Sequence, residues 1–145
     1  MKIIEDTRNQ KGKHKELNAW MSDHGIQVIR SKIVVGDYSL PPKISVDTKQ
    51  GFEELVHNFC SADRERVKRE IIKAREMGTQ LIFLVVDEKA KSIEDAKKWK
   101  NKFGKVKGET LYKTLDTFTK RYGVRFEFST AEKSGEKIVE LLKGG

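Results

Sequence analysis

The chain has 145 residues and a mass of 16.7 kDa, which predicts one compact domain over residues 1–145. Its hydrophobic fraction of 37% suffices for a core, and its longest apolar run, residues 81–86, is far too short to span a bilayer, so we expect neither disorder nor a membrane or secretory protein. The formal charge of +8 at pH 7 favours a polyanionic partner, and the single Cys60 rules out an internal disulfide, so we expect a cytoplasmic protein.

The first part of the chain alternates between strand and helix patterns. We expect strands at residues 2–5 and 26–35, separated by a helix at residues 13–24 whose apolar side chains recur at helical spacing. After a Pro-Pro turn, another strand pattern covers residues 44–48. The two strands on either side of this turn predict a meander.

One apolar strand dominates the rest of the chain. Residues 52–77 predict two helices with a break near Cys60, and residues 80–86 form a nearly continuous aliphatic run, typical of a strand that is covered on both faces. We therefore expect residues 80–86 to form the central strand. A polar helix, a longer helix, a strand and a terminal helix follow, at residues 93–99, 109–122, 124–128 and 131–142. The elements together predict an α/β domain.

Asp37, Asp47 and Lys49 are the strongest candidates for chemistry. Because side chains alternate along a strand, Asp47 and Lys49 should share a face, and Asp37 should join them if the strands pair across the Pro-Pro turn. Two carboxylates without a Cys or His pattern favour Mg²⁺ or Mn²⁺, and such a site suits phosphodiester hydrolysis with Lys49 assisting the attacking water. Taken alone, these residues are also compatible with a solvated salt bridge in a surface hairpin.

The order of the motifs resembles that of a known nuclease family. Asp6-Thr7-Arg8, Gly36-Asp37-Tyr38, and Asp47-Thr48-Lys49 followed by Glu53 are similar to the D-x-R-E, G-D and E-R-K-x-x-x-D series of the XPF-type structure-specific endonucleases. This group is a branch of the PD-(D/E)XK superfamily. The resemblance implies a restriction-endonuclease-like fold with a mixed central β-sheet flanked by helices. It also implies a Mg²⁺-dependent or Mn²⁺-dependent endonuclease acting on branched, flap or single-strand-containing DNA.

The resemblance also assigns roles by matching position. It implies metal ligation by Asp37, Asp47, the backbone carbonyl of Thr48 and the outer carboxylate of Asp6, catalysis by Asp37, Asp47 and Lys49, and support from Arg8 and Glu53. The sequence departs from the family pattern where Asp47 replaces Glu, Thr48 replaces Arg and Asn9 replaces Glu. The wider superfamily accepts either acid at the Asp47 position, so we expect catalysis to be kept. No helix-hairpin-helix domain is expected within these residues.

Two basic segments are candidates for nucleic-acid binding. Arg64 and Arg66 begin a predicted helix and are expected to contact phosphates, although acidic neighbours three to four residues away would equally make them part of a salt-bridged helix. Residues 97–107 contain six lysines and no acid, and the candidates there are Lys100, Lys102 and Lys105. We expect Trp99 and Phe103 in this segment to anchor it to the core rather than to stack on a base.

The remaining chemistry-bearing residues show no motif. His14, His24 and His57 have no partner at metal-ligand spacing and are interpreted as ordinary polar side chains. The alternative to a nuclease is a catalytically inactive nucleic-acid-binding module or partner subunit, because the family includes inactive halves. DNA is the expected partner, but the sequence does not choose between DNA and RNA. It also leaves open whether two such domains pair as a homodimer.

Overall fold

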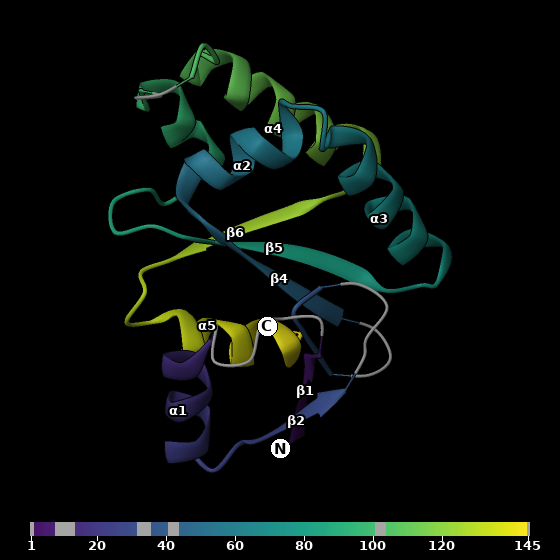
Figure 1. Ribbon diagram of the computed structural model, residues 1–145, viewed down its shortest axis with the longest axis vertical. Helices are drawn as coiled ribbons and strands as arrows, with labels where there is room; N and C mark the ends of the chain where they lie inside the picture. Colours follow the sequence, from purple (N-terminus) through teal and green to yellow (C-terminus); the bar gives the residue numbers. More distant parts are fainter. Residues whose placement is uncertain (1, 8–13, 32–35, 41–43, 101–103, 145) are drawn as a thin grey trace.

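A six-stranded mixed β-sheet separates two layers of helices (Figure 1). This computed structural model describes residues 2–7, 14–31, 36–40, 44–100 and 104–144. The elements in chain order are β1 (Lys2–Asp6), α1 (Lys15–Asp23), β2 (Gln27–Ser31), β3 (Tyr38–Leu40), β4 (Ile44–Gln50), α2 (Gly51–Phe59), α3 (Arg64–Glu76), β5 (Gln80–Val86), the 3₁₀ helix η1 (Ile93–Lys98), α4 (Gly108–Tyr122), β6 (Arg125–Ser129) and α5 (Ser134–Leu142). Helices α2, α3 and α4 cover one face, and α1 and α5 cover the other.

The direction of the strands decides where functional residues can gather. The strand order is β2-β1-β3-β4-β5-β6, and only β3 is antiparallel to its neighbours. The carboxyl ends of the other five strands therefore lie along one edge of the sheet. In open α/β sheets this edge is where ligands bind.

The predicted α/β class, the mixed sheet and the positions of the main elements are confirmed, but the predicted meander is wrong. Strand β2 pairs only with β1, in parallel, and forms an outer edge of the sheet. The strand that pairs with β4 across the turn is β3, which has only three residues and was not predicted. Alternation in a sequence identifies a strand but does not identify its partner, and three residues are too few to show alternation.

The apolar strand β5 explains the two-layer core. Leu81, Phe83 and Val85 face α2, α3 and α4, whereas Ile82 and Leu84 pack into the cluster under α1 and α5. Strand β5 is thus covered on both faces, as predicted, although it lies next to the β6 edge and not at the centre of the sheet.

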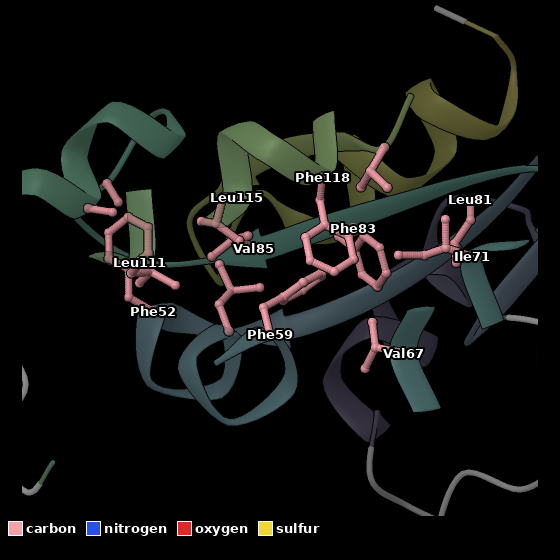
Figure 2. Packing of buried hydrophobic residues seen from close by; sticks show 14 of the residues in the cluster. Phe52, Phe59, Val67, Ile71, Leu81, Phe83, Val85, Leu111, Leu115 and Phe118 are labelled. Carbon is pink, nitrogen blue, oxygen red and sulfur yellow. The ribbon is translucent and has the colours of Figure 1, made fainter. Parts of the chain in front are cut away.

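Aromatic rings fill the layer beneath α2, α3 and α4. The ring of Phe59 makes edge contacts with Phe83, Phe118 and Phe126 at centroid distances of 5.4, 4.9 and 5.6 Å. Figure 2 shows Phe59, Phe83 and Phe118 in this packing. Such pairs add to the free energy gained from apolar burial. Among the described residues, no helix has the length and apolar character needed to cross a membrane.

Candidate active site

The short strand β3 leaves a gap in the sheet between β1 and β4. The pairing of β3 with β4 runs no further along β4 than Val46, which lies opposite Tyr38. Asp37 continues from β3 into the gap: its amide donates to the carbonyl of Val46 (2.9 Å), and its own carbonyl accepts from the amide of Asp6 (2.8 Å). The backbone thus fixes Asp37 between the end of β1 and the carboxyl half of β4.

The carboxylate of Asp37 is held by Thr48. Asp37 Oδ2 accepts hydrogen bonds from the Thr48 amide (2.9 Å) and from Thr48 Oγ1 (2.8 Å), and both residues are buried. The amide and the carbonyl of one strand residue point to the same side of the strand, so the Thr48 carbonyl also faces the gap. The Thr48 side chain is buried, and its hydroxyl binds a carboxylate.

Asp47 and Lys49 lie side by side on the other face of β4, as predicted. Lys49 Nζ is 3.4 Å from Asp47 Oδ2; the Lys49 side chain is buried and the Asp47 side chain is 13% exposed. In the β4–β5 register Asp47 lies opposite Phe83, and Lys49 Nζ is 5.6 Å from the centroid of the Phe83 ring. The Phe83 ring, which is part of the apolar layer beneath α2, α3 and α4, therefore lies next to both charged groups.

The carboxylates of Asp37 and Asp47 repel each other electrostatically. Burial raises the pKa of Asp47 well above its ordinary value, the neighbouring Asp37 raises it further, and Lys49 lowers it only in part. The charge of Glu70 on α3 also raises the pKa of Asp47. Such a pair is stabilised by a cation between the two groups.

The donor set fits a hard divalent ion. Within the ranges that the structure describes, no three His, Cys, Asp or Glu side chains form a cluster that could hold a metal alone. Magnesium does not need such a cage, because one or two carboxylates, water and substrate phosphates usually complete its coordination. Asp37 and Asp47, with the Thr48 carbonyl beside them, meet that requirement.

The other predicted site residues lie at different distances from this pair. Asp6 is buried and its amide binds Asp37, so it belongs to the site. Glu53 lies on the first turn of α2, where its exposed Oε1 accepts a hydrogen bond from Trp99 Nε1 (3.2 Å). Arg8 is outside the described residues.

His14 is a site residue that the sequence analysis did not nominate. It immediately precedes α1 and is buried, and its Nε2 atom lies 3.9 Å from Asp37 Oδ2. A lone histidine has no ligand spacing to reveal it in a sequence. The available signal was topological: a helix that follows β1 begins at the sheet edge where β1 ends.

A buried polar network ties α1 to the strands of the site. Glu5 is 1% exposed, and its carboxylate accepts hydrogen bonds from Asn18 (3.2 Å), Arg30 (3.3 Å) and the Tyr38 hydroxyl (3.5 Å). The Tyr38 hydroxyl also donates to Asn18 Oδ1 (2.8 Å). Burial, followed by the charges of Glu5 and Asp37, raises the pKa of Tyr38 above its ordinary value. Tyr38 therefore stays a neutral donor beside the Asp37 carboxylate.

The two arginines predicted to contact phosphates, Arg64 and Arg66, both contact other side chains of the protein. Arg66 binds Asp63 through two hydrogen bonds (2.7 and 2.8 Å) and Glu70 through a third (3.4 Å), and this pairing lowers the pKa of Asp63. The guanidinium of Arg64 lies 5.3 Å from the centroid of the Phe118 ring. These contacts favour the salt-bridged interpretation for Arg66, and the phosphate contacts of both arginines stay predictions.

The described part of the lysine-rich segment contacts α2 through Trp99. Trp99 packs against Phe52 at a centroid distance of 6.1 Å, which confirms its anchoring role, whereas Phe103 is outside the described residues. Lys100 and Lys105 are exposed, and Lys102 lies outside the described residues. Two of the three predicted lysines are therefore on the surface, and their contacts with nucleic acid stay predictions.

We compared the chain with known protein families and solved structures. The sequence model of the ERCC4 domain matches residues 5–141. The structure of XPF from Aeropyrum pernix superposes with a TM-score of 0.71 at 15% identity, over 98% of this chain and 59% of that one. XPF from Aeropyrum pernix in complex with DNA gives a TM-score of 0.66 at 17% identity, over 97% of this chain and 62% of that one.

At these identities the structural similarity shows the fold, and the chain spans about three fifths of the length of these two structures. The comparison with curated proteins gave no match. The match to the family model covers nearly all of the chain, including every motif described above. The chain therefore belongs to the ERCC4 domain family, and its fold is the one predicted from the XPF-type motifs.

Proposed function

We propose that the chain is a metal-dependent endonuclease that hydrolyses phosphodiester bonds in DNA. The observation that carries this proposal is the convergence of Asp37, Asp47 and Lys49 at the gap beside β4. These residues come from two separate motifs, and their charged groups are buried against each other. Desolvation of two carboxylates next to a lysine lowers the free energy of unfolding, so a catalytic role explains this arrangement better than a stabilising role does.

Asp37, Asp47 and the Thr48 carbonyl would hold Mg²⁺ or Mn²⁺, with Asp6 supporting the site from the end of β1. When bound, such an ion polarises a phosphoryl oxygen and lowers the pKa of an attacking water. Thr48 keeps one oxygen of Asp37 occupied with hydrogen bonds, so the orientation of this carboxylate is set before substrate arrives.

Lys49 is the residue that meets the reacting phosphate. Its ammonium is held by Asp47 on one side and by the Phe83 ring on another, so few rotamers are open to it. From this position Lys49 orients the attacking water and stabilises the negative charge that develops on the pentacovalent phosphorus. In-line attack by this water would require the scissile phosphate to bind next to Asp37, Asp47 and Lys49, at the gap between β1 and β4.

The substrate we propose is branched, flap or single-strand-containing DNA. The support is the family membership, the XPF-type motif series and the formal charge of +8. An XPF structure with the same fold was solved in complex with DNA. The exposed Lys100 and Lys105 are the proposed contacts to the backbone of this substrate.

A cleavage assay tests the proposal. Purified protein is incubated with labelled flap, splayed-arm and plain duplex DNA in Mg²⁺, in Mn²⁺ and in EDTA. We expect cleavage of the branched forms with either metal and none with EDTA. Asp37→Asn and Lys49→Met should each reduce the rate by about a hundredfold or more.

Controls separate the rival functions. Glu65→Gln, at an exposed position on α3, should cleave like the unmodified chain. DNA that is shifted in a gel but left intact in both metals would contradict the nuclease proposal and identify a binding module. RNA of identical shape, offered in parallel, tests whether the enzyme distinguishes the two polymers.

A further inference from the structure

A cleft of about 310 Å³ lies at the carboxyl ends of β4 and β5. Its lining includes two aromatic rings, two lysines and two aspartates, namely Phe52, Trp99, Lys89, Lys98, Asp87 and Asp95. Phe52 follows Lys49 by three residues and belongs to the same cluster of apolar side chains as Phe83, the ring beside the Lys49 ammonium. The cleft and the Lys49 ammonium therefore lie on the same face of the sheet.

Trp99 is held firmly in the wall of this cleft. Its ring packs against Phe52 at a centroid distance of 6.1 Å, and its Nε1 atom donates to Glu53 Oε1 (3.2 Å). Its amide donates to the Ala96 carbonyl (3.1 Å), and a Cβ atom at Gly108 would collide with the carbonyls of Ala96 and Trp99, so α4 packs directly against this turn. Because Trp99 is half-buried and lines the cleft, these anchoring contacts leave part of its surface open to a ligand.

The aspartates and the lysines of the cleft differ in their partners. Each aspartate accepts two hydrogen bonds from backbone amides, both at 2.8 Å for Asp87, and at 2.7 and 3.2 Å for Asp95. Lys89 and Lys98 are exposed, and neither forms an ion pair with another residue in the part of the chain that the structure describes. Backbone amides therefore stabilise the negative charges, while the two ammonium groups are open to an anionic ligand.

This combination of groups suits a nucleotide of a single strand. Aromatic rings stack on bases, and nearby lysines bind the phosphates on either side. The volume of the cleft is at the lower limit for ligand sites, which suits one flat ring system and not a duplex. A base within a duplex is paired and stacked on both sides, so only an unpaired base can enter such a cleft.

We propose that this cleft binds an unpaired base of the DNA substrate against Trp99, with the neighbouring phosphates at Lys89 and Lys98. This inference rests on the proposed function and gives the single-stranded part of the substrate a place on the protein. The cleft lies at the sheet edge beside Lys49, so a strand bound there is continuous with the phosphate that is cut. The protein should accordingly prefer DNA that has an unpaired arm over plain duplex.

Fluorescence anisotropy in EDTA measures this preference without cleavage. The full chain is titrated into labelled splayed-arm DNA, into the same DNA with abasic arms and into plain duplex. We expect Trp99→Ala to weaken binding of the intact arms about tenfold and binding of the duplex less than twofold. Abasic arms should weaken binding to the unmodified chain by a similar factor, and Trp99→Ala should cause no further loss on them.

Three variants serve as controls. Trp99→Phe keeps an aromatic ring and should retain most of the affinity for the intact arms. The double variant Lys89→Gln/Lys98→Gln removes phosphate contacts, so it should weaken binding of intact and abasic arms alike and reduce the salt dependence. Lys143→Gln, an exposed lysine directly after α5, should bind every DNA like the unmodified chain.

The comparison of intact and abasic arms keeps the test valid even if Trp99→Ala does not fold, because it also uses the unmodified chain. Equal affinities of the unmodified chain for intact and abasic arms, or equal losses of Trp99→Ala on the arms and on the duplex, would overturn base binding. Metal-dependent cleavage with no such preference would leave the proposed nuclease standing. Base-dependent binding without cleavage in Mg²⁺ or Mn²⁺ would support the cleft and contradict the nuclease.

Discussion

Two regions of the molecule differ in the chemistry of their side chains. One is the face of the sheet under α2, α3 and α4, and the other is the corner where β1, β3 and β4 meet. The first, which we call the aromatic layer, consists of apolar rings, namely Phe52, Phe59, Phe83, Phe118 and Phe126. The second, the polar corner, consists of buried and half-buried charged and polar groups, namely Glu5, Asp6, His14, Asn18, Asp37, Tyr38, Asp47, Thr48 and Lys49. The aromatic layer gains stability from burial, whereas the polar corner loses part of that stability to desolvation.

The two regions meet at Phe83. Its ring is part of the aromatic layer, and the ammonium of Lys49 lies above the same ring. The apolar side therefore supplies a packed support, and the polar side holds the groups that we propose to react. The comparison teaches that stability and function are carried by different residues in this small domain, so mutations should separate them.

The largest expected effect is on the aromatic layer. Phe59→Ala removes a fully buried ring that contacts three others, and it should lower the free energy of unfolding by about 3–5 kcal/mol. Urea denaturation followed by circular dichroism measures this loss. A change below about 1 kcal/mol would show that the layer is not the stabilising region.

Thr48→Val should affect metal binding more than folding. Valine keeps the β-branched shape but removes the hydroxyl that binds Asp37 Oδ2, so the carboxylate loses one of its two restraints. We expect the dissociation constant for Mn²⁺, measured by calorimetry, to rise about tenfold to a hundredfold. Thr48→Ser keeps the hydroxyl and should stay close to the unmodified chain. Equal affinities for the valine and serine variants would contradict the positioning role.

These two regions also differ in how well the sequence predicted them. Strand β5 could be read from an unbroken aliphatic run, and the amphipathic patterns gave α2, α3 and α4 to within a few residues. The periodicity of apolar residues shows which side of a helix or strand is buried, and the buried sides together form the apolar layer. The aromatic layer was therefore predictable.

The polar corner was only half predictable. The shared face of Asp47 and Lys49 follows from strand alternation, and the motif order located Asp37. The two hydrogen bonds of Thr48 and the approach of His14 depend on where β3 stops and where α1 starts. Those endpoints are set by tertiary pairing, which no local pattern contains.

Asp37→Asn should stabilise the metal-free protein while it abolishes cleavage. The asparagine can still accept from Thr48, but its loss of charge removes the repulsion on Asp47. We expect a gain on the order of 1 kcal/mol in the free energy of unfolding at neutral pH in EDTA. Loss of both stability and cleavage in this variant would show that Asp37 is needed for folding.

The same repulsion predicts a pH dependence. The folded state raises the pKa of Asp47 above its ordinary value of 3.8, so the folded state binds this proton more tightly than the unfolded state. The stabilisation is present at low pH and is lost as the pH rises above 3.8 and through the raised value. Thermal melting in EDTA should show this decline for the unmodified chain and a shallower one for Asp37→Asn. Parallel curves for the two proteins would contradict the coupling.

The smallest effect is expected at the surface of α3. Arg66→Gln breaks the pairs with Asp63 and Glu70, but Arg66 is exposed and solvent screens such pairs. The free energy of unfolding should change by about 1 kcal/mol or less, and by still less in high salt. A larger, salt-independent loss would mean that Arg66 belongs to the polar corner.

The central claim is that the polar corner binds a divalent ion where Asp37 and Asp47 meet. The direct measurement is anomalous diffraction from crystals of the chain grown with Mn²⁺. The account predicts one or two peaks in contact with the Asp37 and Asp47 carboxylates, with the Lys49 ammonium beside them. No manganese at these carboxylates in well-ordered crystals, or peaks only at surface acids, would contradict it.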